Sequence, residues 1–413
     1  MDDSDRLRSD TNVGSGRPIV NTHVHLPPNF SAFETAEQAV RVGAAEGVAA
    51  VGTSNYHDFR VYVRFAAAAA AANIVPLFGV EIITLIDDLP GEGMLINDPT
   101  NLNRMYLCGK AITRLDPPIP AAAHRMAAIR YASEDRMREM TARIAARFAQ
   151  AGLDGNLTDN RIAALVAERA GVPVEWVSLQ ERHVAQAFQE VLFREVAPDD
   201  RAAMLGRLFG TPTTAGTTDA VAVQEAIRSN LMKAGKPAFV AEAAVSFADA
   251  YRLILDLGGI PCYPILADGA SPICPFEDPP EALAQSLLGR GVYCAELIPG
   301  RNRPEVVDRY VAALRGVGIV VTAGTEHNTQ RMIPLEPKAL GGEPLSETAR
   351  EAFWEGTCVV AAHQKLSAAG EPGYVDGDGR PAAGFADGEA RIRSFRRIGG
   401  DLITARAVAG VQA

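Results

Sequence analysis

Apolar and polar positions in the first 90 residues alternate between two periods. Short, mostly apolar runs typical of buried strands cover residues 18–24, 48–55 and 74–83, and helical periodicity covers 31–47 and 60–72. Ser31, followed by Glu34 three residues later, predicts the start of the first helix, and Gly47 predicts its end. This β-α-β-α-β order predicts a parallel sheet or a (β/α) barrel.

The pattern becomes helical from about residue 120 to 235 and then returns to alternation. Helices are expected at 246–259, 279–291 and 303–318, each followed by a strand at 260–266, 292–299 and 319–328, and a last helix at 346–370. We therefore expect a disordered tail at 1–16, a discontinuous barrel built from 17–112 and 242–340, a helical insertion at 113–241, and a helical and loop extension at 341–413.

Composition narrows the class of protein. The net charge is −10, which argues against a general binder of nucleic acid or of anionic membranes. The most apolar run, 63–80, is rich in alanine and is interrupted by Asn73 and Pro76, so no membrane span is expected. Five irregularly spaced cysteines, at 108, 262, 274, 294 and 358, suit a reducing cytoplasm. The sequence is compatible with a homo-oligomer.

Polar side chains with ligand-forming groups occur at the carboxyl ends of several predicted strands. In a (β/α) barrel, the reacting groups lie at these ends. His23 and His25 are two residues apart on a strand and so face the same side. Alone, this pair fits either two metal ligands or two polar residues with no chemistry. Combined with Glu81 and Glu326 at other strand ends, it predicts a site for Zn, Mn or Fe.

The order of these motifs resembles that of the PHP (polymerase and histidinol phosphatase) family. The family's motifs correspond here to "THVH" (22–25), "GVAAVGTSNYHD" (47–58), "LFGVE" (77–81), "GGIPCYP" (258–264) and "GTEHN" (324–328). Residues 235–264 and "ERHVAQAF" (181–188) are similar to the branch of nucleoside bisphosphate phosphatases that carries a helical insertion. The resemblance covers residues 17–335. It implies a distorted (β/α)7-type barrel, α/β in class, and metal-dependent phosphoesterase chemistry.

Several family ligands are replaced in this chain. Carried over residue by residue, the resemblance implies that His23, His25, Glu81 and Glu326 hold one divalent metal ion, where active relatives hold two or three. The family's other Asp and His positions are occupied here by Asn55, Tyr56, Tyr106, Tyr263 and Asn328, unless a one-residue insertion restores His57 to the place of Tyr56. Neutral tyrosine is a poor ligand for Zn or Mn, so these changes indicate an altered site.

The remaining polar groups receive expected roles. His57 or His327 would act as general acid or base, because histidine titrates near neutral pH. Tyr263 would donate a hydrogen bond to substrate or transfer a proton. We expect the polar segment 97–110 to be a substrate loop, and expect substrate contacts from Asn55, Arg104, Tyr106, Lys110, His183, Arg301, Arg303 and Asn328.

Three hypotheses of function follow. The first is a metal-dependent hydrolase that acts on a small anionic substrate, most simply a phosphate ester, by metal-activated water. The second keeps the metal but changes the reaction to non-phosphate hydrolysis, isomerisation or lyase chemistry on a sugar-like compound. The third is a non-catalytic binding protein on a degenerate PHP scaffold.

Overall fold

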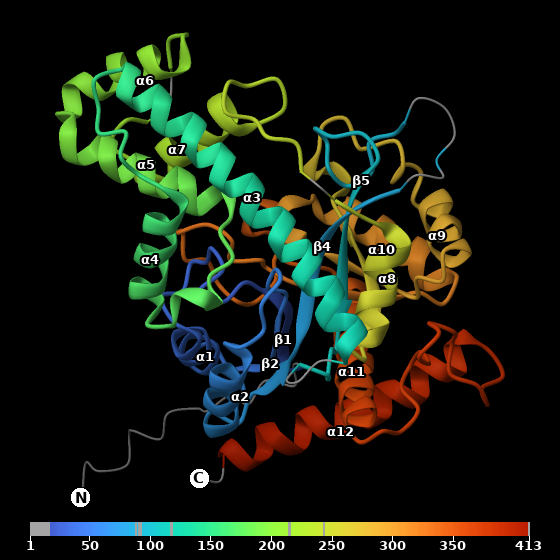
Figure 1. The fold of residues 1–413 in the computed structure, drawn as a ribbon. Coiled ribbons are helices and arrows are strands. Elements are labelled where there is room, and N and C mark those ends of the chain that lie inside the picture. Colours follow the sequence, from blue (N-terminus) through green and yellow to red (C-terminus); the bar gives the residue numbers. More distant parts are fainter. Residues whose placement is uncertain are drawn as a thin grey trace, which may run out of the picture.

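The protein is an α/β structure in which a group of helices lies beside a core of strands (Figure 1). The structure is a computed structural model that describes residues 17–86, 89, 93–115, 119–213, 216–242 and 244–411, with side chains up to residue 406. The predicted tail at 1–16 lies outside the described residues.

Two sheets provide the strands. The first has the order β1 (Ile19–Val24), β2 (Val48–Thr53) and β3 (Val75–Leu77), all parallel. The second has the order β6 (Val245–Ser246), β4 (Gly79–Leu85), β5 (Arg104–Lys110), β7 (Ile260–Ile265), β8 (Cys294–Leu297) and β9 (Val320–Ala323). The sheets are mostly parallel, but β5 is antiparallel to both of its long neighbours, β4 and β7.

Two sequence predictions about this region are wrong. The strand expected at 74–83 is divided into β3 and β4, which belong to different sheets. The segment 97–110 was expected to be a loop, yet its second half forms β5. Its charged ends, Arg104 and Lys110, gave it a polar pattern, but both side chains are buried and paired with carboxylates inside the protein.

Isolated bridges connect the two sheets, one from the edge strand β1 and one from the residues just after the central strand β2. Val24, at the end of β1, bridges to Glu326 just after β9, and Asn55, just after β2, bridges to Val80 in β4. The backbone N–H of His25 donates to the carbonyl of Glu326 at 2.8 Å. The carboxyl end of β1 therefore lies directly beside the carboxyl end of β9.

Helices cover the strands. They are α1 (Ala36–Ala45), α2 (Tyr62–Ala71), α8 (Phe247–Asp256), α9 (Pro280–Gly289), α10 (Pro304–Gly316), α11 (Glu347–Ala368) and α12 (Gly388–Val411). Short 3-10 turns occur at Val174–Trp176, Pro198–Asp200, Ala267–Gly269, Pro299–Arg301 and Leu340–Gly342.

The expected start of the first helix at Ser31 is wrong. Its hydroxyl instead donates to the carbonyl of His25, and Thr35 caps α1.

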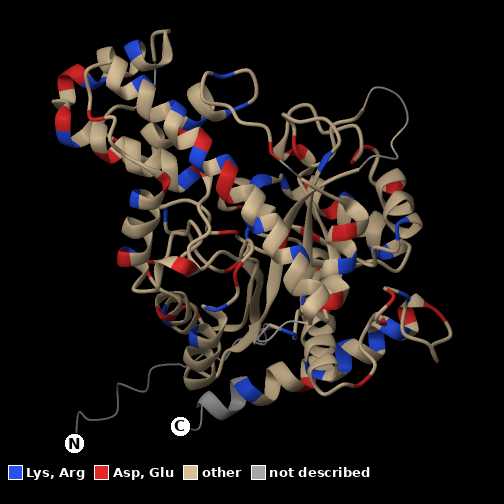
Figure 2. Cartoon of the chain, viewed as in Figure 1, with Lys and Arg blue, Asp and Glu red and all other residues tan. Residues whose placement is uncertain are grey.

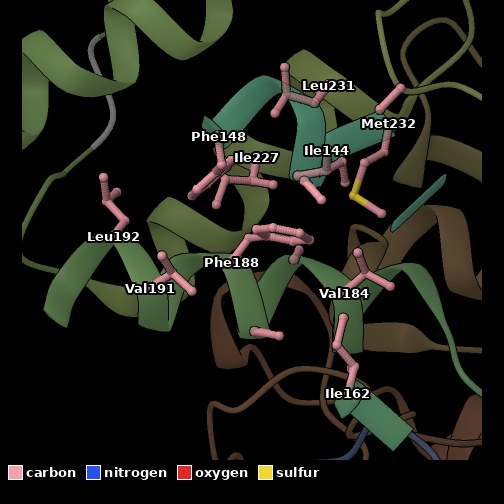
Figure 3. Close-up of a cluster of buried hydrophobic side chains, with 14 of the residues drawn as sticks. Ile144, Phe148, Ile162, Val184, Phe188, Val191, Leu192, Ile227, Leu231 and Met232 are labelled. Atoms are coloured by element: carbon pink, nitrogen blue, oxygen red, sulfur yellow. The ribbon is translucent and has the colours of Figure 1, made fainter. Parts of the chain in front are cut away.

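The segment between β5 and β6 is helical and has its own core. It contains α3 (Pro120–Gln150), α4 (Asp159–Ala170), α5 (Glu181–Glu195), α6 (Arg201–Phe209) and α7 (Ala220–Ile227), followed by a π-helical turn at Arg228–Met232. Phe148 and Phe188 pack at the centre of this core, with ring centroids 4.8 Å apart (Figure 3). The long helix α3 extends from this group to α8 beside the strands (Figure 1).

The described part of the chain contains no helix with both the length and the apolar character needed to cross a membrane. All five cysteines are buried with free thiols.

Candidate metal centre

Three ligand atoms converge at the carboxyl end of β1. Alternate residues of a strand face the same side, so β1 directs both His23 and His25 inward, and β4 contributes Glu81. The two Nε2 atoms lie 3.4 Å apart, and Oε2 of Glu81 lies 3.5 Å from Nε2 of His23 and 3.3 Å from Nε2 of His25. All three side chains are buried, and they form a group that could hold a metal ion.

The spacing of these atoms fits a divalent ion. In a tetrahedral zinc site with ligand distances of about 2.0–2.1 Å, neighbouring ligand atoms lie about 3.3–3.4 Å apart. The observed separations of 3.3–3.5 Å match that geometry. Two imidazole nitrogens and one carboxylate oxygen also form a donor set that suits Zn, Mn or Fe. The residues present therefore fit the expected cofactor.

A second carboxylate orients His23. Oε1 of Glu296, from β8, lies 2.7 Å from Nδ1 of His23. Because a carboxylate only accepts hydrogen bonds, Nδ1 carries the proton, and in the neutral ring Nε2 keeps its lone pair facing Glu81. This arrangement is the one that metal-ligating histidines usually show. Nδ1 of His25, by contrast, is buried with no hydrogen-bond partner among the described residues.

Lys110 neutralises Glu296 inside the protein. Its Nζ donates to Oε2 of Glu296 at 2.6 Å and to the carbonyl of Thr22 at 3.0 Å. Burial would raise the pKa of Glu296, but Lys110 and His23 together lower it to about 2. The charged pair is thus buried next to the candidate metal ligand His23, and Lys110 is only 2 % exposed.

Tyr56 engages the second oxygen of Glu81. Its hydroxyl donates to Oε1 of Glu81 at 2.7 Å, and its ring stacks on His25 with centroids 5.4 Å apart. Burial and the neighbouring Glu81 raise the pKa of the Tyr56 hydroxyl well above its ordinary value, so this group remains a donor. One oxygen of Glu81 therefore faces the histidines while the other is occupied.

Glu326, the fourth expected ligand, has other partners. Its carboxylate pairs with the guanidinium of Arg301 and accepts from the amide of Asn328. Its backbone adopts a left-handed conformation, with φ of 60°, and its N–H donates to the carbonyl of His23 at 2.8 Å. The structure places Glu326, Arg301 and Asn328 together next to β1, with the carboxylate directed to Arg301.

The three expected acid–base groups lie in different surroundings. His57 is half-buried, with Nδ1 3.4 Å from the Ser178 hydroxyl, and burial, assisted by Arg130, lowers its pKa to about 4. His327 uses both ring nitrogens, on the Thr325 hydroxyl at 2.8 Å and the Ile333 carbonyl at 2.9 Å.

Tyr263 is fully buried among side chains of β8, α9 and α10. Its hydroxyl donates to Glu277 at 2.9 Å, so the structure gives it a partner apart from the His23–His25–Glu81 group.

Most expected substrate contacts are internal ion pairs or hydrogen bonds. The Asn55 amide donates to the carbonyl of Leu26 and accepts from its N–H, both at 2.8 Å. Arg104 is buried and pairs with Glu242 at 3.1 Å. Lys110 is buried against Glu296, as described above.

The other expected contacts lie at the edges of the site or beyond. Arg303 is exposed and pairs with Asp268 at 2.9 Å. His183 caps α5, where its Nδ1 accepts from the N–H of Gln180 at 3.1 Å. Tyr106 is half-buried on β5 opposite Ile83, and burial raises the pKa of its hydroxyl.

Glu296 and Cys108 received no role in the sequence analysis, and Tyr56 was named there only as a residue that replaces a family ligand. Cys108 joins His23 and Glu296 in a second group with metal-ligand spacing, although burial raises the pKa of its thiol to about 12. One signal could have indicated Glu296. It is the single charged residue in the otherwise apolar run 292–299.

Comparisons with known proteins agree with this architecture. No protein-family model and no curated protein matches the sequence. Among solved structures, one match is an amidohydrolase from Chromobacterium violaceum with bound sulfate and no metal, at 18% identity and a TM-score of 0.50, covering 81% of this chain and 96% of that one. Another is a candidate metal-dependent phosphoesterase from Bifidobacterium adolescentis, at 17% identity and a TM-score of 0.52, covering 83% and 97%. The chain therefore shares the α/β fold of these two proteins, as its resemblance to the PHP family predicted.

Proposed function

We propose that this protein is a metal-dependent hydrolase of a small anionic substrate, most simply a phosphate ester. The observation that carries the proposal is the convergence of two imidazole nitrogens and a carboxylate oxygen at 3.3–3.5 Å, with Glu296 holding His23 in the tautomer that binds metal. The bridges that connect the ends of β1 and β2 to the second sheet support a closed, distorted (β/α)7-type barrel as its scaffold.

His23, His25 and Glu81 would hold one Zn, Mn or Fe ion. When bound, such an ion lowers the pKa of a coordinated water and supplies a hydroxide nucleophile near neutral pH. Tyr56 supports a single ion, because its hydroxyl occupies Oε1 of Glu81. Glu296 and Lys110 keep His23 in position during turnover.

Two further groups of the chain serve the substrate. Arg301 provides a guanidinium whose planar fork suits phosphate or carboxylate oxygens. Burial lowers the pKa of His57 to about 4, so it is neutral at pH 7 and would offer a ring nitrogen as a hydrogen-bond partner to substrate or water.

A second function keeps the metal and changes the reaction to non-phosphate hydrolysis, isomerisation or lyase chemistry. The observation that favours it is the pairing of Arg301 with Glu326, which already neutralises the guanidinium that a phosphate would need. A mono-anionic or neutral sugar-like substrate requires fewer cations than a phosphate dianion.

Metal analysis tests the metal site first. Purified protein should contain Zn, Mn or Fe, and after chelation each added ion should raise the melting temperature. His23→Ala should abolish the metal content and the shift, whereas the exposed His124→Ala should retain both. An apoprotein whose melting temperature ignores all three ions would overturn the proposal.

A panel of phosphate monoesters and diesters, assayed with the bound metal, then separates the two reactions. Turnover that His23→Ala abolishes supports the phosphoesterase. A metal-loaded protein that hydrolyses no phosphate ester supports the second function instead.

A further inference from the structure

A cavity between α11 and α12 has no role in the proposed reaction. Its volume is about 380 Å³, and it is lined by Trp354, Arg393, Arg396, Arg397, Gly400 and Asp401. Pockets for small ligands in proteins usually begin at about 300 Å³. The cavity is therefore large enough for a small molecule.

This cavity is remote from the candidate metal centre. Helices α11 and α12 pack on Val20, Ala49 and Val75, at the amino ends of β1, β2 and β3. The metal ligands lie at the carboxyl end of β1. In Figure 1, α12 crosses the end of the molecule opposite to α5, α6 and α7.

Two glycines of α12 shape the cavity. A Cβ on Gly399 would lie 1.8 Å from the carbonyl oxygen of Cys358, so this glycine allows the two helices to touch. A Cβ on Gly400 would come no closer than 4.0 Å to the ring of Trp354. Because Gly400 has no side chain, part of the indole of Trp354 is left uncovered beside the helix.

The arginines place unbalanced positive charge next to this ring. Arg396 pairs with Glu351, but within the described part of the chain no ion pair is formed by Arg393 or Arg397, which are both exposed. These two lie four residues apart on α12, so they face the same side, and like charges at this spacing repel each other. Lys and Arg are distributed along α12 in Figure 2.

We propose that this cavity binds a phosphorylated aromatic molecule of the size and chemistry of a purine mononucleotide. The indole of Trp354 offers a surface for stacking a planar base. Arg393 and Arg397 offer two guanidiniums, whose geometry matches phosphate oxygens. Together with the Asp401 carboxylate in the same lining, they leave a net positive charge that favours a phosphate. This site is independent of the proposed hydrolysis.

Fluorescence of Trp354 gives a direct measurement. The chain has two tryptophans, so Trp176→Phe leaves Trp354 as the single reporter. AMP should quench its emission in a saturable way. Adenosine and inorganic phosphate, each supplying half of the recognition, should bind at least tenfold more weakly. Equilibrium dialysis of the unmodified chain with AMP should return the same affinity.

Variants then assign the site. Arg393→Ala/Arg397→Ala should lower AMP affinity at least tenfold, whereas Arg161→Ala, an exposed arginine on α4, should not change it. Both positions are exposed, so the variants should keep the melting temperature and the metal content of the parent chain. Retention of the metal response separates this test from that of the proposed hydrolysis.

Two outcomes overturn the proposal. The first is absence of saturable AMP binding to the full chain. The second is AMP binding that Arg393→Ala/Arg397→Ala leaves unchanged.

Discussion

The Nδ1 atom of His23 lies 2.7 Å from Oε1 of Glu296, and this contact determines which nitrogen of the ring is free for a metal. A carboxylate behind a histidine fixes its tautomer and strengthens it as a ligand. Glu296 is buried and bonded on both oxygens, since Oε2 receives Lys110 at 2.6 Å and the Thr22 hydroxyl at 3.1 Å. The Nδ1 side of the His23 ring is therefore fixed by a carboxylate that is itself held by hydrogen bonds on both oxygens.

Removal of this support should weaken metal binding without removing a ligand. We expect Glu296→Gln/Lys110→Met, which deletes both buried charges together, to lower Zn affinity about 10–100-fold, the usual cost of losing such a partner. Isothermal titration calorimetry on the chelated protein measures it. Unchanged affinity in a folded double variant would contradict the positioning role of Glu296.

The buried ion pair also has a measurable effect on stability. Lys110→Met alone should lower the free energy of unfolding by about 3–5 kcal/mol, because it leaves the Glu296 carboxylate without its cation. The double variant should recover much of that loss. Urea denaturation of the parent, Lys110→Met, Glu296→Gln and the double variant completes the cycle, and a double variant whose loss equals the sum of the two single losses would show that the pair is not coupled.

The role of the Tyr56 hydroxyl can be tested by a substitution that removes one oxygen atom. Tyr56→Phe keeps the stack on His25 but removes the donor to Oε1 of Glu81. A hydrogen bond to a charged group contributes about 1.5–3 kcal/mol, so metal affinity should fall roughly 10–100-fold. The matched control is Tyr131→Phe, at an exposed position on α3. A variant that takes up two equivalents of metal would support the role of the hydroxyl in limiting the site to one ion.

His363 should make the fold sensitive to acid. Burial lowers its pKa to about 4, although its hydrogen bond to the Gly258 carbonyl opposes the shift. The unfolded chain, with a histidine pKa near 6.5, binds more protons between pH 4 and 6.5, so stability is fully present above pH 6.5 and is lost as pH falls.

His363→Gln removes this pH-dependent contribution to the free energy of unfolding, which is about 3 kcal/mol between pH 6.5 and 4. The free energy of unfolding of the variant should therefore fall less steeply from pH 6.5 to 4 than that of the parent. Chemical denaturation at several pH values measures it, with the exposed His124→Gln as control. An identical slope in His363→Gln would contradict the assignment.

Local sequence patterns predicted only those features of the candidate centre that follow from the geometry of a single strand. The spacing of His23 and His25 was sufficient to predict that both rings face one side, because alternate residues of a strand always do. Glu81 was predicted as a ligand at the carboxyl end of the strand expected at 74–83, but in the structure it is the third residue of β4 (Gly79–Leu85). The partner of Glu326 could not be predicted, because it depends on where the side chain of Arg301 lies in the folded protein.

The role of Glu296 was missed for a different reason. Its cation is supplied by Lys110, on a strand whose polar ends give it the pattern of a loop. Tertiary pairing of charges, which no local period reveals, made that segment a buried strand. The alternating β/α order, by contrast, was predictable because each element carries its own apolar pattern.

The backbone contact between the ends of β1 and β9 makes assembly of the candidate metal centre depend on the late docking of β9. The backbone N–H of His25 finds its partner only when residue 326 of the 413 is in place, 301 residues further along the chain. Contacts of such long sequence separation form slowly, because the entropy of closing the loop must be lost first. Metal uptake during refolding would therefore report the last docking step, and a chain released without its final strand would have histidines but no assembled centre.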